Sequence, residues 1–119
     1  MPLPAPSLTV TASTRRVPPD SVLPAAGACA RIAGRIVTIA AMPDTPQPRC
    51  VVVTADQRLR VVNRAAGAVV AVRFAAFPTQ ELKLGQAVLY TPPMGRFLAP
   101  GVHDVHISLY AGSAEVWLR

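Results

Sequence analysis

The residues best suited to chemistry include two histidines that flank an aspartate near the carboxyl end of the chain. His103, Asp104 and His106 form the pattern His-Asp-x-His, which places metal-ligating side chains close together in the sequence. The surrounding residues alternate between apolar and polar, which predicts a strand, and positions 103 and 106 of a strand point to opposite faces. Both histidines could bind one metal ion only if the strand bent sharply between them. We therefore expect no metal site and no cofactor.

The thiol and hydroxyl side chains form no catalytic pattern. Cys29 and Cys50 are too few for a disulfide-rich secreted scaffold or a zinc site, so reduced thiols in an intracellular protein are expected. Neither Cys50 nor Ser108 stands in a motif that activates a nucleophile, and the six acidic residues are scattered singly. The sequence also has no Gly-rich phosphate loop of the G-x-x-x-x-G-K type. We expect that the protein is not an enzyme.

The excess of arginine indicates an anionic partner. The chain of 119 residues has 12 Lys and Arg against 6 Asp and Glu, a net charge of +6, and every cation except Lys83 is an arginine. The planar guanidinium group fits phosphate oxygens, which makes nucleic acid the natural candidate. The alternative is that these arginines only keep the surface solvated. No apolar run reaches the roughly 18 residues of a membrane-spanning helix, so we expect no membrane partner.

The elements that must position these residues are predicted to be strands. Apolar and polar residues alternate in short Val-rich runs that Gly and Pro interrupt. The five expected strands cover residues 28–38, 49–62, 68–77, 86–91 and 102–110, and the second is bent or broken near Asp56. At the carboxyl end, Ser113 is a good N-cap and Glu115 lies in the first turn, which predicts the start of a helix over residues 113–119.

Five strands without long helices favour an antiparallel sheet that closes on itself and so removes its exposed edges. The predicted fold is all-β, a small five-stranded antiparallel barrel of the OB type with a short C-terminal helix start. An SH3-like barrel and a fragment of a sandwich remain open. The predicted organisation is a flexible Pro-rich segment over residues 1–20, the barrel over 21–112 and the helix start over 113–119.

Four arginines are the predicted nucleic-acid-binding residues. Arg31 and Arg35 share the outward face of the first expected strand, and Arg58 and Arg60 share one face of the second. A hairpin of these strands would present four guanidinium groups together. Binding to single strands also uses exposed aromatic rings, and most rings here fall at positions that core packing explains.

The apolar end of the chain is the predicted partner interface. Val116, Trp117 and Leu118 follow the expected barrel, which has little use for them unless they contact another subunit. The alternative is that Trp117 covers the open end of the barrel.

Residues 14–37 (TRRVPPDSVLPAAGACARIAGRIV) resemble the N-terminal part of the smallest subunit of replication protein A. The matching elements are Arg16-Val17, Leu23 and Gly34-Arg35-Ile36, and the end of the chain, ISLYAGSAEVWLR, is similar to a last strand that continues into a C-terminal helix. The smallest subunit of the telomeric CST complex has the same architecture and is equally compatible with these residues.

The resemblance implies an OB-fold assembly subunit of a heteromeric, single-stranded DNA-binding complex in the nucleus. Such a subunit would act in DNA replication, DNA repair or telomere maintenance. It would bind the larger OB-fold subunits of a heterotrimer and contact single-stranded DNA only weakly. The alternatives are a stand-alone basic OB-type nucleic-acid-binding protein and a structural barrel subunit of an organellar assembly.

Overall fold

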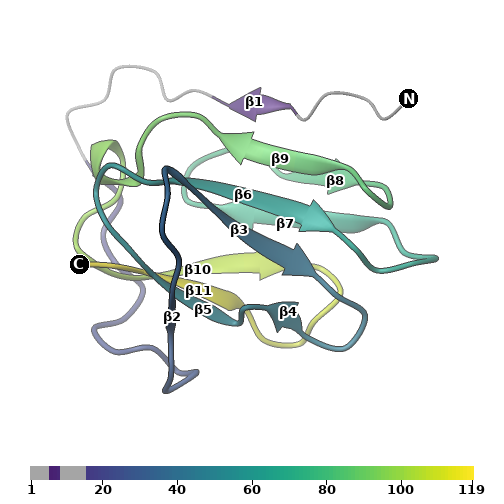
Figure 1. The fold of residues 1–119 in the computed structure, drawn as a ribbon, viewed down its shortest axis with the longest axis horizontal. Coiled ribbons are helices and arrows are strands. Elements are labelled where there is room, and N and C mark those ends of the chain that lie inside the picture. Colours follow the sequence, from purple (N-terminus) through teal and green to yellow (C-terminus); the bar gives the residue numbers. More distant parts are fainter. Residues whose placement is uncertain (1–5, 9–15) are drawn as a thin grey trace.

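Val-rich runs of alternating burial build eleven short strands in the described part of the chain. The computed structural model describes residues 6–8 and 16–119, in which the strands form two sheets that pack face to face (Figure 1). In spatial order, the five-stranded sheet contains β1 (Ser7–Leu8), β9 (Ala87–Tyr90), β6 (Arg58–Asn63), β3 (Ile36–Ala41) and β4 (Pro46–Gln47). The six-stranded sheet contains β2 (Ala30–Arg31), β5 (Cys50–Val53), β11 (Ala114–Leu118), β10 (Gly101–Ile107), β7 (Val70–Phe74) and β8 (Gln80–Leu82).

Both sheets are mixed. In the five-stranded sheet, β3 is parallel to β6, and β9 is antiparallel to β6 on its other side. In the six-stranded sheet, β11 is parallel to β5, and β10 is antiparallel to both β11 and β7. A 3₁₀ turn, η1 (Met94–Arg96), follows β9. No helix among the described residues is long and apolar enough to cross a membrane.

The hydrophobic core lies between the two sheets. On β3, Val37 and Ile39 are fully buried and alternate with side chains that are partly exposed, as the period of a strand requires. The aromatic side chains gather at one end of this core, where the Phe74 and Tyr90 ring centroids are 5.1 Å apart and those of Phe77 and Phe97 are also 5.1 Å apart. Edge contacts of this kind add to the stability gained from burial.

Residues 16–31, which we call the N-terminal strap, run across the outer face of the six-stranded sheet (Figure 1). Ser21 forms a bridge with Val102, and farther along the strap Ala30 pairs with Val51. The approach is close at Gly101, which has φ +130°, and a Cβ there would lie 2.5 Å from the Cβ of Pro19. The strap therefore packs directly on the start of β10 and leaves the β7 and β8 half of this face open.

The predicted all-β class agrees with the structure, but the closed five-stranded barrel is wrong. The first expected strand divides into β2 and β3, and the second divides into β5 and β6, so each contributes to both sheets. The chain leaves one sheet for the other at residues 32–35 and 54–57, close to the break predicted at Asp56. The strands form two separate sheets, edged by β1 and β4 and by β2 and β8, and these sheets stack as a sandwich.

The C-terminal helix start is also wrong, because residues 114–118 form strand β11. Ala114, Val116 and Leu118 point into the core, while Glu115 and Trp117 point outward, so a period of two prevails over the N-cap signal of Ser113. Of the predicted flexible segment 1–20, residues 1–5 and 9–15 lie outside the described residues.

Candidate functional site

The four arginines predicted to bind nucleic acid are divided between the two sheets. Arg31 lies on β2 of the six-stranded sheet, Arg35 lies in the connection to β3, and Arg58 and Arg60 lie on β6. Arg58 donates from Nε to the carbonyl oxygen of Thr91, and Arg60 donates from Nε to Thr38 Oγ1 at 3.0 Å. The hairpin that would bring all four guanidinium groups together does not form.

Two of the three predicted partner-interface residues belong to the core. Val116 is fully buried and Leu118 is 5% exposed, both within the cluster between the sheets. Trp117 lies on the outer face, partly exposed, with the guanidinium carbon of Arg119 4.7 Å from its ring centroid. This cation–π contact stabilises the end of the chain. Of this set, only Trp117 offers surface to a partner.

The two histidines lie on opposite faces of β10, as the sequence predicts. His103 is 2% exposed, and its Nε2 lies 2.6 Å from the carbonyl oxygen of Ala99. His106 is exposed on the outer face, with its Nδ1 3.0 Å from Ser113 Oγ. Among the described residues, no three His, Cys, Asp or Glu side chains are close enough together to hold a metal ion.

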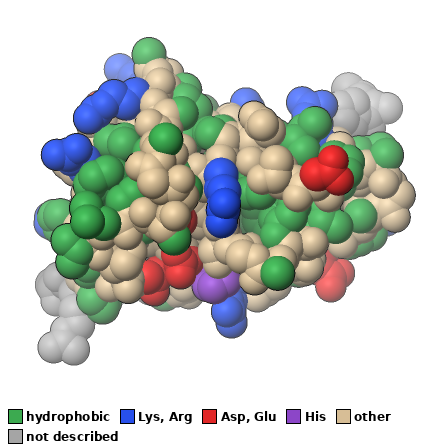
Figure 2. All heavy atoms as spheres, turned by 90° about the horizontal axis from the view of Figure 1, so that it is seen from below, with side chains coloured by type: hydrophobic (Ala, Val, Ile, Leu, Met, Phe, Trp, Pro, Cys, Tyr) green, Lys and Arg blue, Asp and Glu red, His purple; other side chains and the backbone are tan. Residues whose placement is uncertain are grey.

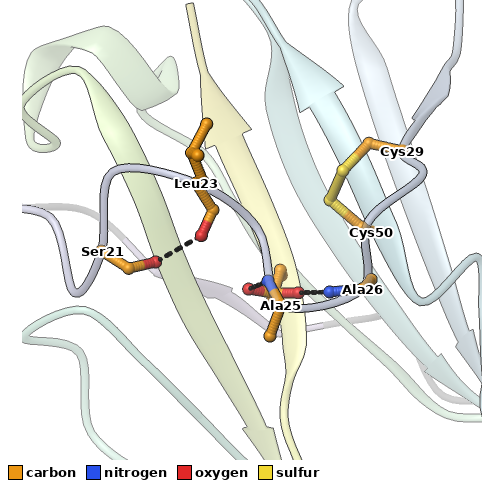
Figure 3. The surroundings of a disulfide bond; sticks show 7 residues. Ser21, Leu23, Ala25, Ala26, Cys29 and Cys50 are labelled. Carbon is orange, nitrogen blue, oxygen red and sulfur yellow. Dashed lines mark hydrogen bonds between the residues drawn. A yellow bond between two sulfur atoms is a disulfide. The ribbon is translucent and has the colours of Figure 1, made fainter.

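The expectation of reduced thiols is wrong in this structure, because Cys29 and Cys50 form a disulfide with an S–S distance of 2.03 Å. Cys50 begins β5 and points to the outer face, where Cys29 of the strap meets it (Figure 3). The sequence separation of 21 residues gave no hint of this contact, which depends on the strap crossing the sheet.

Glu115 is a structural residue that the sequence analysis assigned to a helix. It is 5% exposed, and its two carboxylate oxygens accept hydrogen bonds from the backbone N–H groups of Ala25 and Ala26, each at 2.9 Å. Figure 3 shows these bonds joining the strap to β11, beside the disulfide. Because Glu115 is in register with Cys50, two neighbouring strands hold the same part of the strap.

A hollow of about 350 Å³ lies on the open half of the outer face, beside the loop 108–113. His106 lies directly opposite Arg73 in the register of β10 and β7, so the two basic side chains are neighbours on this face. Six polar residues line the hollow, and they are Arg73, Thr79, His106, Ser108, Tyr110 and Ser113. No Asp or Glu of the described chain lines it.

A second hollow of about 280 Å³ lies on the strap side of Arg73 and His106, and it is lined by Asp20 and Asp104. Asp20 Oδ2 accepts a hydrogen bond from the backbone N–H of Asp104 at 2.8 Å. Burial raises the pKa of Asp104, and the nearby negative charge of Asp20 raises it further. The outer face therefore has an acidic side next to the strap and a basic side next to the loop 108–113.

Hydrogen bonds hold the loop 108–113 at its first residue and at Tyr110. Tyr110 donates from its hydroxyl to the carbonyl oxygen of Met42, and burial raises the pKa of that hydroxyl. Ser108 Oγ accepts a hydrogen bond from the N–H of Ala71 at 2.9 Å. On the face drawn in Figure 2, several basic side chains gather near one end, another stands alone near the centre, and the histidine lies between acidic side chains and a basic one. This face carries no continuous basic stripe.

The comparisons with known proteins concern the fold. No family model matches the sequence, and no curated protein matches it. The structure is similar to a purple cupredoxin from Nitrosopumilus maritimus, with a TM-score of 0.56, 10% identity, and coverage of 69% of this chain and 98% of that chain. Two copper(I) structures of amicyanin variants have TM-scores of 0.48, with identities of 17% and 20%, covering 74% and 87% of this chain and 86% and 96% of theirs. The first likeness establishes a cupredoxin-like sandwich fold.

The resemblance to the smallest subunit of replication protein A, and to that of the telomeric CST complex, is therefore wrong. The sequence motifs that carried the resemblance do not occupy the structural positions that an OB fold would give them. Gly34-Arg35-Ile36 marks the crossing from one sheet to the other, and the end of the chain is a core strand. Short apolar motifs of this kind occur in any Val-rich strand.

The functions taken from that resemblance are wrong as well. The sandwich does not support an assembly subunit of a single-stranded DNA-binding complex, with its larger OB-fold partners, its DNA contact and its roles in replication, repair and telomere maintenance. The same holds for the stand-alone OB-type nucleic-acid-binding protein and the organellar barrel subunit, because both require the barrel.

Proposed function

We propose that this chain is a non-enzymatic binding module that works in an oxidising compartment and carries no redox copper. The observation that carries the proposal is the Cys29–Cys50 disulfide, which joins the strap to the start of β5 on the outer face. Structural disulfides persist where the surroundings are oxidising and are rare where thiols are kept reduced. The nuclear location stays a prediction of the sequence resemblance, and the disulfide favours an extracytoplasmic location instead.

Copper-dependent electron transfer is the function that the similar structures suggest, since their names describe a cupredoxin and copper(I) amicyanins. A copper site of that kind needs one cysteine thiolate and two histidines, usually with a weak axial methionine. The sequence has two cysteines, and both are in the disulfide. Its two histidines point to opposite faces of β10. These donors do not fit the copper site.

A binding role is supported by the way in which the outer face is built. The strap covers one half of the six-stranded sheet and is fixed there by Glu115, by the disulfide and by the pairing of Ala30 with Val51. The other half is left hollowed and polar. A rigid sandwich that presents hollows between fixed loops is the common form of a recognition module.

The first test measures the redox state of the thiols. The protein is produced in an oxidising compartment, alkylated under denaturing conditions with and without prior reduction, and weighed by mass spectrometry. We expect two alkylated cysteines after reduction and none without it. Two free thiols in the unreduced protein would overturn the proposal.

The second test measures copper chemistry. Copper(II) and copper(I) are titrated into the oxidised protein while visible absorption is recorded, with a known blue copper protein as the positive control. We expect no thiolate-to-copper charge-transfer band, because the chain has no free thiolate. An intense band at one copper per chain would restore electron transfer as the function.

A further inference from the structure

We propose that the hollow beside the loop 108–113 binds a phosphate group. The hollow is lined by one guanidinium group, one imidazole and the hydroxyl groups of Thr79, Ser108 and Ser113, while no carboxylate of the described chain lines it. The hydroxyl of the fourth hydroxyl-bearing residue, Tyr110, already donates to Met42. Guanidinium, imidazole and hydroxyl groups can all donate hydrogen bonds, and the guanidinium group also carries a fixed positive charge. Such a set is suited to an oxyanion and unsuited to a metal cation. This inference goes beyond the proposed function, which would stand without it.

The fold places the donors beside one another, and some of them have fixed partners. The register of β7 and β10 fixes Arg73 and His106 side by side, and both side chains reach the hollow. Ser108 Oγ accepts the N–H of Ala71, so the hydroxyl hydrogen of Ser108 remains to be donated. Ordered donors bind an anion more tightly than flexible ones, because less conformational entropy is lost on binding.

The hydrogen bond between His106 Nδ1 and Ser113 Oγ can form in either direction. When the imidazole is neutral, Ser113 can donate its hydroxyl hydrogen to Nδ1, which lies 3.0 Å from its Oγ. When the imidazole is protonated, Nδ1 donates to Ser113, and the hydroxyl hydrogen of Ser113 turns toward the ligand. In either arrangement the pair keeps an N–H or O–H donor for a ligand.

The acidic hollow on the strap side restricts where an anion can lie. Asp20 and Asp104 line that hollow together with Arg73 and His106, so the two basic side chains separate the carboxylates from the phosphate position. An anion that moved toward the strap would approach both carboxylates and be repelled. The hollow of about 350 Å³ is within the range of small-molecule sites and leaves room for a substituent on the phosphate.

The test is a titration of the isotope-labelled, oxidised protein with inorganic phosphate, followed by ¹H–¹⁵N NMR at fixed pH and constant ionic strength. We expect saturable shifts confined to the amides of β7, β10 and the loop 108–113. Glycerol phosphate and acetate are titrated in parallel. Binding of both phosphates supports recognition of phosphate monoesters, and binding of inorganic phosphate alone supports recognition of the free ion.

Matched variants test the role of Arg73. The exposed side chain of Arg73 is replaced in Arg73→Ala, and an equally exposed arginine outside the hollow is replaced in Arg64→Ala. We expect Arg73→Ala to weaken phosphate binding about tenfold, as the loss of one charge-assisted hydrogen bond requires, and Arg64→Ala to leave it unchanged. The NMR spectra also report whether each variant is folded.

Three results would overturn the inference. One is that neither inorganic phosphate nor glycerol phosphate gives saturable shifts. Another is that acetate binds as tightly as phosphate. The third is an equal loss of affinity in the two arginine variants. None of these results would affect the disulfide or the copper titration, so a failure here is distinguishable from a failure of the proposed function.

Discussion

At the scale of single residues, Tyr90 combines complete burial with a hydroxyl group that has no hydrogen-bond partner in the described structure. The ring packs against Phe74 and Phe77 between the sheets. Burial raises the pKa of this hydroxyl, because its ionised form would be strongly disfavoured there. The aromatic ring therefore contributes to stability, whereas the hydroxyl group opposes it.

We expect Tyr90→Phe to raise the free energy of unfolding by about 1 kcal/mol, because it removes a buried polar group that lacks a partner. Urea denaturation of the oxidised protein measures the change. Tyr110→Phe is the matched control, since it removes a hydroxyl that donates to Met42 and should not stabilise the protein. A loss of stability in Tyr90→Phe would mean that an internal water molecule satisfies the hydroxyl.

Asp104 makes stability depend on pH in the direction opposite to that of most carboxylates. Its pKa is raised above the ordinary value of 3.8 by burial and by Asp20, so the folded state favours the protonated form. Its contribution is present below pH 3.8 and is lost as the pH rises through the raised pKa. We expect Asp104→Asn to stabilise the protein at neutral pH and to have little effect below pH 3.8.

Urea denaturation at the two pH values measures this difference. Asp44→Asn is the control, because Asp44 is exposed in the loop between β3 and β4 and its replacement should matter little at either pH. Equal effects of Asp104→Asn at both pH values would show that hydrogen bonding, and not charge, accounts for the change.

At the scale of elements, the strap depends on a few anchors rather than on a long pairing. Glu115→Gln keeps the size of the side chain but replaces one carboxylate oxygen with an NH2 group, which cannot accept a hydrogen bond. One of the two N–H groups, of Ala25 or of Ala26, then loses its partner. We expect the free energy of unfolding to fall by about 1–3 kcal/mol.

The effect should be local as well as global. Hydrogen exchange of the Ala25 and Ala26 amides is expected to accelerate more in Glu115→Gln than that of the β3 amides in the opposite sheet, which report only the global loss of stability. Glu81→Gln, an exposed change on β8, serves as the control for altered net charge. Unchanged exchange at Ala25 and Ala26 would mean that the disulfide alone fixes the strap.

The elements also explain what the sequence could and could not predict. Alternation located the segments that form β2, β3, β5, β6, β7, β9 and β10, because the period of burial is local information, but it missed the short β1, β4 and β8 and the last strand, β11. The alternation did not reveal that residues 28–38 and 49–62 each cross from one sheet to the other, since a crossing changes the inward and outward pattern of only a few side chains. At residues 113–118 the N-cap pattern of Ser113 favoured a helix, and the inward Val116 and Leu118 required a strand.

At the scale of the whole molecule, the stacking of two sheets brings together residues that no motif connects. The disulfide, the Glu115 anchor and the hollow beside the loop 108–113 each combine segments far apart in the chain. Pairing between distant strands is not encoded in periodicity, so the candidate site was outside the reach of the sequence analysis. Only the placement of His103 and His106 on opposite faces followed directly from the pattern.

The net charge of +6 also acts at this scale. Because Arg31, Arg58 and Arg60 are divided between two sheets, we expect attraction to polyanions without a dedicated site. Elution from immobilised heparin in a salt gradient measures this. The double variant Arg58→Ala and Arg60→Ala should elute at the same salt concentration as the double variant Arg49→Ala and Arg64→Ala, because each variant removes two positive charges. Clearly earlier elution of the first pair would mean that β6 carries a specific polyanion site, since total charge alone cannot distinguish the two variants.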